Sequence, residues 1–140
     1  NFSLDNLFPY INLVAGGKKK YLKIFGHDWD TPDGTCIRDY IHIMDLSKAH
    51  IATIEMLLEN DPQYINLNIG TGVGISVLDV VKTFSEVNNV KIPYKFVKRR
   101  MGDVGKLVAD NKKAMQTLNW VPNKSLKEIC KDSWKCFLKN

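Results

Sequence analysis

The chain has 140 residues, of which 44% are hydrophobic and 25% charged, a balance typical of one globular domain. Its three cysteines lack a CxxC pair and predict neither a disulfide framework nor a zinc site. Without a run of about 18 apolar residues or a secretory signal pattern, we expect a cytoplasmic protein that does not span a membrane.

The net charge of +5 raises the question of a nucleic-acid partner. The lysines are scattered along the chain, and no RNA-binding aromatic motif lies between them. We therefore expect a solvated, lysine-rich surface and no nucleic-acid partner.

The first elements are a helix and a short strand. Residues 3–17 carry the apolar spacing of a helix, and Pro9 fits only within its first turn. Asn6 and Leu7 then stand at the helix start, where backbone N–H groups are unpaired. A basic turn leads to a predicted strand over 21–25.

The spacing of the apolar residues changes from that of a strand to that of a helix near Asp45. Apolar and polar residues alternate from Ile37 to Ile43, which predicts a strand with Arg38 on its polar face. Asp45 is a suitable N-cap for a helix ending near Glu59. This helix carries two apolar stripes, which is typical of burial between two layers and indicates a larger body. The planar fork of Arg38 suits a carboxylate or a phosphate, and a structural ion pair is the alternative.

The next segment has the order strand, glycine-rich turn and helix. Alternation over 64–69 predicts the strand, residues 70–74 form the turn, and Ser76 begins the helix. A dinucleotide-binding loop has this order, but the spacing here is GxGxG, and no acidic residue follows at the required distance. We therefore favour a structural turn over a phosphate cradle.

The C-terminal third adds a strand over 92–97 and a basic loop at 98–103. Two helices follow, one capped by Asp110 and one by a capping box of Ser125 and Glu128. The order of elements predicts an α/β fold.

Seven stretches that together span nearly the whole chain form a recognisable pattern. They are NLFPYI at 6–11, LKIFG at 22–26, DGTCIRDYIHIMDL at 33–46, NIGTG at 68–72, SVLDVV at 76–81, RRMGD at 99–103 and LNW at 118–120. In these stretches and in their order the chain resembles the UDP-glucose 4-epimerases, which are extended short-chain dehydrogenases/reductases. The run at 33–46 is highly specific, whereas the glycine turn is shared by many extended reductases.

The resemblance implies a fold and a reaction. Residues 1–140 would be the C-terminal, UDP-sugar-binding portion, which in the family packs on a Rossmann NAD-binding domain that this chain lacks. The family interconverts UDP-glucose and UDP-galactose by passing a hydride to NAD and back through a 4-keto intermediate. Because its glycine-rich loop and YxxxK residues belong to the N-terminal half, we expect this chain alone to be inactive. Its partners would be a UDP-hexose and the NAD-binding half, in cis or in trans, and the intact enzyme would be a homodimer.

The resemblance also implies a binding site. The uracil would lie against Lys23 to Phe25, and Asp103 would reach the ribose hydroxyls. Leu107 would line the pocket beside the C2 substituent of the sugar. Family members with a tyrosine there favour UDP-glucose and UDP-galactose, whereas smaller residues leave room for an N-acetyl group. The alternative for Leu107 is a core residue.

The diphosphate would be bound by Arg38 and Arg100, with further contacts from Asn6 and Leu7. A pyrophosphate suits two bidentate arginines and a helix N-terminus. Two other functions stay open: a non-catalytic nucleotide-sugar-binding module, and a portion of another extended reductase such as a nucleotide-sugar dehydratase.

Overall fold

The computed structural model describes residues 6–59 and 64–139. In that part of the chain helices and short strands alternate, which confirms the predicted α/β class, and no helix is long and apolar enough to cross a membrane. The helices are α1 (Leu7–Ala15), α2 (Ile43–Glu59), α3 (Val77–Asn88), α4 (Lys112–Leu118) and α5 (Leu126–Leu138), and the strands are β1 (Leu22–Phe25), β2 (Ile37–Asp39), β3 (Gly74–Ser76), β4 (Tyr94–Val97) and β5 (Lys106–Leu107).

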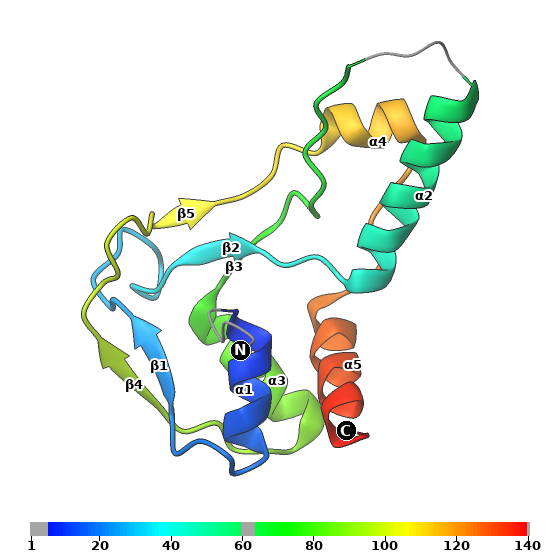
Figure 1. Ribbon diagram of the computed structural model, residues 1–140. Coiled ribbons are helices and arrows are strands. Elements are labelled where there is room, and N and C mark those ends of the chain that lie inside the picture. Colours follow the sequence, from blue (N-terminus) through cyan, green and yellow to red (C-terminus); the bar gives the residue numbers. More distant parts are fainter. Residues whose placement is uncertain (1–5, 60–63, 140) are drawn as a thin grey trace.

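The larger part of the molecule, which we call the body, consists of α1, α3, α5, β1 and β4 (Figure 1). Strands β1 and β4 pair in parallel, with Leu22 opposite Tyr94. One apolar cluster joins the three helices and β1, and Ile11 of α1, Phe84 of α3 and Cys130 of α5 are all fully buried in it. The body therefore has a core of its own.

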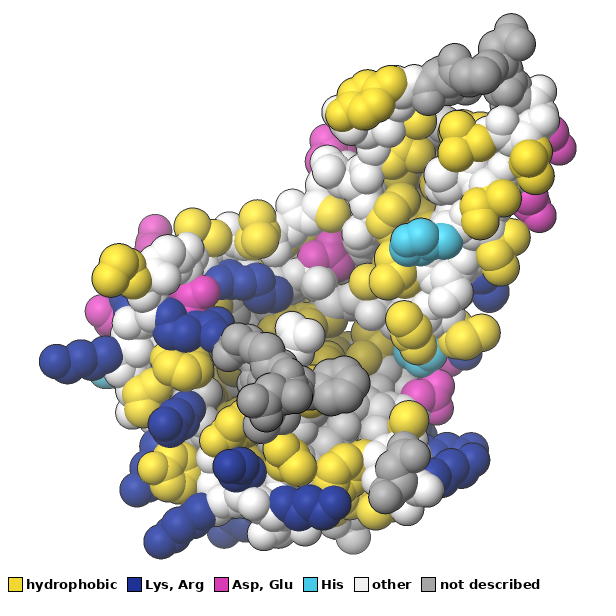
Figure 2. Space-filling model, in the orientation of Figure 1, with side chains coloured by type: hydrophobic (Ala, Val, Ile, Leu, Met, Phe, Trp, Pro, Cys, Tyr) yellow, Lys and Arg dark blue, Asp and Glu magenta, His cyan; other side chains and the backbone are white. Residues whose placement is uncertain are grey.

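Helices α2 and α4 form an arm that projects from the body (Figure 1). The arm buries Ala49, Leu118 and Trp120 against one another. Strand β2 leads from the body to the arm and is the middle strand of a small sheet, antiparallel to β3 and parallel to β5. The second apolar stripe of α2, formed by Ile51, Ile54 and Leu58, is exposed on the arm (Figure 2).

The boundary between β2 and α2 differs from the prediction. The strand ends at Asp39 and the helix begins at Ile43, because Nδ1 of His42 accepts the N–H of Met44 at 3.0 Å, as an N-cap does. Asp45, the predicted cap, is a fully buried residue of the first turn.

Asp45 instead ties the arm to a distant loop. Its Oδ2 accepts the N–H groups of Asn123 at 2.9 Å and Lys124 at 2.8 Å, and its carbonyl accepts Nε1–H of Trp120 at 3.1 Å. The N-cap prediction was wrong because these partners are remote in the sequence.

The strand predicted over 64–69 is also absent. Burial does alternate there, with Leu67 and Ile69 packing on the apolar cluster of the arm, but no described strand pairs with this segment. Alternation reports which side chains are buried, whereas a strand also needs a partner for its backbone. The nearest strand is β3, which lies beyond the glycine turn.

The glycine turn is structural, as favoured. The N–H groups of Thr71 and Gly72 each donate to the carboxylate of Asp39 at 2.9 Å. These donors are therefore satisfied within the protein.

The other helix ends mostly match the prediction. Ser76 caps α3, and Ser125 with Glu128 forms the expected capping box of α5. Helix α4 matches in part: its N-cap position is Asn111, whose side chain makes no capping hydrogen bond, and the predicted Asp110 accepts the N–H of Lys112 at 3.3 Å. Helix α1 begins at Leu7, and residues 3–5 of its predicted start lie outside the described part of the chain.

Candidate functional site

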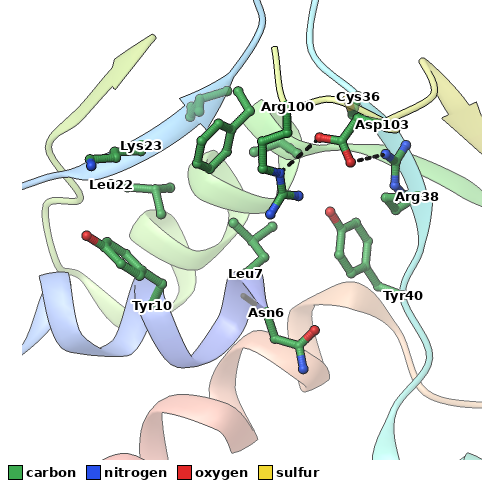
Figure 3. A pocket seen from close by; sticks show the side chains of 13 residues that line it. Asn6, Leu7, Tyr10, Leu22, Lys23, Cys36, Arg38, Tyr40, Arg100 and Asp103 are labelled. Atoms are coloured by element: carbon green, nitrogen blue, oxygen red, sulfur yellow. Dashed lines mark hydrogen bonds and ion pairs between the residues drawn. The ribbon is translucent and has the colours of Figure 1, made fainter. Parts of the chain in front are cut away.

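A cavity of about 360 Å³ opens between α1, β1, β2 and the loop at 98–103 (Figure 3). These segments are far apart in the sequence, and the fold brings their polar and cationic side chains to one place. The lining residues are Asn6, Leu7, Tyr10, Leu22, Lys23, Ile24, Phe25, Cys36, Arg38, Tyr40, Val77, Arg100 and Asp103.

One wall of the cavity is the edge of β1 that no described strand covers. The N–H groups of Leu22 and Gly26 donate toward β4, both at 2.8 Å. Because backbone groups of successive strand residues point to opposite edges, Lys23 and Phe25 present theirs to the cavity. The carbonyl of Phe25 accepts Nε1–H of Trp29 at 3.1 Å. The carbonyl of Lys23 and the N–H of Phe25 therefore stand side by side as an acceptor and a donor.

The cationic end of the cavity is built around Asp103. Its Oδ2 accepts Nε–H of Arg100 at 3.1 Å, and its Oδ1 lies 3.7 Å from Nη2 of Arg38. Two guanidinium groups and one carboxylate leave a local charge of about +1, which suits an anion.

Backbone and ring contacts hold both arginines in place. Nη1 of Arg38 donates to the carbonyls of Ile37 at 2.9 Å and Val104 at 2.8 Å. The guanidinium of Arg100 lies 4.6 Å from the ring centre of Phe25. Pre-positioned donors lose less conformational entropy when they bind a ligand.

The loop at 98–103 is held against the loop that carries Asp28 and Trp29. The Arg99 guanidinium stacks 3.9 Å from the ring centre of Trp29, and its Nε–H donates to Asp28 at 2.8 Å. This hydrogen bond from Arg99 lowers the pKa of Asp28. Gly102 has a φ of +85°, so it closes the tight turn between Arg100 and Asp103 that other residues would strain.

Asn6 and Leu7 line the cavity from the start of α1. Asn6 is the N-cap residue, with extended backbone, but its side chain makes no capping hydrogen bond. The first turn of α1 therefore keeps backbone donors and the positive end of the helix dipole near the cationic end of the cavity.

Seven of the eight predicted site residues thus line one cavity, and Leu107 is the exception. Leu107 lies on β5 opposite Arg38 and lines a neighbouring cavity of about 510 Å³. Arg38 lines both cavities, so Leu107 stands next to the cationic end. The alternative that Leu107 is a core residue is wrong, because 62% of its surface is exposed.

Six lining residues lie outside the predicted set: Tyr10, Leu22, Ile24, Cys36, Tyr40 and Val77. The alternation from Ile37 to Ile43 places Tyr40 on the same strand face as Arg38, so this pattern could have identified Tyr40 as a lining residue. Burial raises the pKa of Tyr40 to about 12 and also raises the pKa of the Cys36 thiol. No sequence pattern pointed to Cys36 or Val77.

Known proteins resemble this chain over nearly its whole length. The family model described as GDP-mannose 4,6 dehydratase matches residues 1–133. The UDP-glucose 4-epimerase of Bacillus subtilis is 44% identical over 131 residues, which is 94% of this chain and 38% of that protein.

Two solved structures share the fold. The UDP-glucose-4-epimerase of Stenotrophomonas maltophila, crystallised with NAD and formylated UDP-arabinopyranose, superposes with a TM-score of 0.94 at 37% identity, over 99% of this chain and 41% of its own. The UDP-Glc/GlcNAc 4-epimerase of Campylobacter jejuni superposes with a TM-score of 0.82 at 38% identity, over 96% of this chain and 40% of its own. The chain therefore spans about two fifths of the length of these relatives.

The sequence motifs, the fold and these matches agree with one another. The chain belongs to the family described as GDP-mannose 4,6 dehydratase, and it is similar to a portion of the UDP-glucose 4-epimerases, as its motifs predicted.

Proposed function

We propose that this chain is the UDP-sugar-binding portion of a UDP-glucose 4-epimerase, which interconverts UDP-glucose and UDP-galactose through a 4-keto intermediate. The observation that carries the proposal is the convergence of Arg38, Arg100 and Asp103 with the open edge of β1 in one cavity. The cationic end suits a diphosphate, and the open edge of β1 can form hydrogen bonds with a base, so together they suit a nucleoside diphosphate.

The edge of β1 favours particular bases. The carbonyl of Lys23 can accept an N–H and the N–H of Phe25 can donate to a carbonyl oxygen. Uracil offers this pair through N3–H and O4, and guanine through N1–H and O6. Cytosine and adenine have an amino group and an unprotonated ring nitrogen at these places, so they would leave both backbone groups unpaired, which is costly.

The other roles follow from position. The diphosphate binds between Arg38 and Arg100, with Asn6 and Leu7 contributing from the start of α1. Asp103 lies beside both arginines, where its carboxylate can accept a ribose hydroxyl. The sugar then extends past Arg38 toward Leu107.

NAD is the cofactor that relatives such as the Stenotrophomonas enzyme bind. The described residues of this chain do not fit it, because the donors of the one glycine turn that resembles a nucleotide loop are taken by Asp39. We propose that an NAD-binding half, in cis or in trans, supplies the hydride acceptor and the general base. The 140 residues alone then bind substrate without turnover, and the assembled enzyme is a homodimer.

A second candidate is a portion of a GDP-sugar dehydratase. It is favoured by the description of the family model and by the equal fit of guanine to the edge of β1. The relatives are named as UDP-glucose 4-epimerases, which favours uridine over guanosine as the nucleoside of the ligand.

Isothermal titration of the chain with UDP, GDP and CDP tests the proposal. UDP should bind most tightly and CDP should not bind measurably, and Arg38→Ala should abolish UDP binding. Tighter binding of GDP than of UDP would support the dehydratase candidate. Equal binding of all three would show that the edge of β1 does not read the base.

Assembly with an NAD-binding half tests the reaction. The chain can be produced together with the remaining part of the Bacillus subtilis epimerase, and conversion of UDP-galactose to UDP-glucose measured. We expect turnover by the assembled protein and none by either piece. The same assembly carrying Arg38→Ala is the matched control. Turnover by this chain alone would contradict the proposal.

A further inference from the structure

Six lysines of the body gather around β1 and β4, although they come from two separate stretches of the sequence. Lys23 and Lys95 are opposite each other in the register of these parallel strands, so their side chains point to the same face of the sheet. Because parallel strands begin at the same end of a sheet, the lysines that precede β1 meet the one that precedes β4. The six, which we call the lysine surface, are Lys18, Lys19, Lys20, Lys23, Lys91 and Lys95, and all are exposed.

The lysine surface is built from stretches without acidic residues. Residues 6–27 and 87–102 contain no aspartate or glutamate. Figure 2 shows lysine and arginine side chains gathered on the lower part of the body. Helix α2 of the arm, by contrast, carries Lys48 together with Glu55 and Glu59. The lysine surface therefore produces a positive potential that carboxylates of its own stretches do not cancel.

The lysine surface is continuous with the nucleotide cavity. Lys23 belongs to both, because it lines the cavity from β1. Figure 3 shows Lys23 on one side of the cavity and Arg38 on the other. Positive charge thus extends from the face of the sheet to the arginines that we propose for the diphosphate. Charge arranged in this way raises the local concentration of an anionic ligand at the entrance of its site.

The aromatic rings on this face favour a small anion over a nucleic-acid strand. Single-stranded nucleic acids bind where bases can stack on free aromatic faces beside basic groups. Here Nζ of Lys95 lies 4.7 Å from the ring centre of Tyr21, and the guanidinium of Arg100 lies 4.6 Å from that of Phe25. A cation covers each ring, so the surface offers charge and little area for stacking.

We propose that the lysine surface attracts the diphosphate of the UDP-sugar toward the cavity through its electrostatic field. This inference rests on the proposed function, because it takes the ligand to be a nucleoside diphosphate. Of the six lysines only Lys23 is a lining residue, so the other five act at a distance. Their effect must weaken in salt, since the Debye length falls from about 30 Å at 0.01 M to about 3 Å at 1 M.

Calorimetric titration of a charge-reversed variant with UDP and with uridine tests the inference. The variant carries Lys20→Glu and Lys95→Glu, both outside the lining. We expect its UDP affinity to fall about tenfold at about 0.02 M salt and to stay within about twofold of the wild type at about 0.5 M. Affinity for uridine, which has no charge, should stay within about twofold at both.

The matched control reverses the same amount of charge on the arm. Lys112→Glu with Lys113→Glu changes two exposed lysines of α4, and its UDP affinity should stay within about twofold of the wild type at both salt concentrations. Thermal unfolding without ligand shows whether each variant is folded. Should the first variant unfold early, Lys19→Glu with Lys91→Glu repeats the test on the same surface.

The outcomes separate this inference from the proposed function. If the wild-type chain does not bind UDP, the proposed function fails and this inference fails with it. If the wild type binds UDP and the charge-reversed variant binds it equally well at low salt, only the inference is overturned. An equal fall at both salt concentrations, or an equal fall for uridine, also overturns it, because the lysines then act by contact or through the fold. Tighter binding of an oligothymidylate than of UDP, lost in the variant, would assign the surface to nucleic acid instead.

Discussion

The body and the arm bury their apolar residues to very different extents. Phe84 in α3 is fully buried in the body, whereas Ile51, Ile54 and Leu58 of α2 are 56%, 58% and 82% exposed. The binding cavity lies against the body, and the arm keeps an apolar stripe in solvent (Figure 2). The difference indicates that the body carries its own stability, whereas α2 presents a surface suited to another protein layer.

The largest expected effect separates the two cores. Phe84→Ala should lower the free energy of unfolding by about 3–5 kcal/mol, because it leaves a cavity among α3, α5 and β1. Leu58→Ala on the arm should change it by no more than about 0.5 kcal/mol. Urea denaturation followed by circular dichroism gives both values. Similar losses in the two variants would show that α2 is as well packed as the body.

The arginines of the cavity come next. In the chain joined to an NAD-binding half, Arg38→Ala and Arg100→Ala should each weaken UDP-sugar binding by about 1.5–3 kcal/mol, the range for hydrogen bonds to charged groups. Lysine should not fully restore binding at either position, because it lacks the planar fork. Lys98→Ala, in the same loop but outside the lining, is the control in the titration. Wild-type affinity in both alanine variants would reject the assignment.

Leu107 tests the neighbouring cavity, which is also lined by Leu67 and Ile69 from the base of the arm. Leucine leaves a wider pocket than tyrosine, so we expect the chain, joined to an NAD-binding half, to accept UDP-N-acetylgalactosamine as well as UDP-galactose. Discrimination by one side chain is worth about 1–3 kcal/mol, or roughly 10–200-fold in kcat/KM. The measurement is kcat/KM for both sugars in the parent and in Leu107→Tyr. If the tyrosine variant keeps the parent's ratio, Leu107 does not line the sugar pocket.

The pH dependence of the body should reflect the capping box of α5. The Lys124 ammonium, together with donors from Ser125, lowers the pKa of Glu128 from 4.5 to about 2. Because the folded-state pKa lies below the unfolded one, this stabilisation is present above about pH 4.5 and is lost as the pH falls toward about 2. Melting temperatures between pH 2 and 7 should therefore fall less steeply for Glu128→Gln than for the wild type. Parallel curves would contradict the role of the carboxylate.

The smallest effect on stability, and a clear one on association, is expected on the arm. The chain by itself should self-associate and bind a hydrophobic dye through the exposed stripe of α2. Ile54→Lys should reduce both while changing the free energy of unfolding by no more than about 0.5 kcal/mol. Light scattering and dye fluorescence measure the two properties. A wild-type chain that is monomeric, unfolds cooperatively and binds no dye would contradict this prediction.

The sequence by itself determined the features that depend on neighbouring residues. Helical spacing, the capping box of Ser125 and Glu128, and the Ser76 cap are interactions within one turn, so their pattern can be read directly. The motifs also identified seven of the residues that line the cavity, Arg38 and Arg100 among them. Their resemblance to the family carried this information, since no local pattern placed the two arginines together.

Only the tertiary structure decided the features that depend on distant partners. Residues 64–69 alternate like a strand, yet a strand exists only where another segment pairs with it. Asp45 has the chemistry of a cap, but donors more than 70 positions away make it a buried tie to Asn123 and Lys124. Such contacts join residues far apart in the chain, and no local period or cap encodes them.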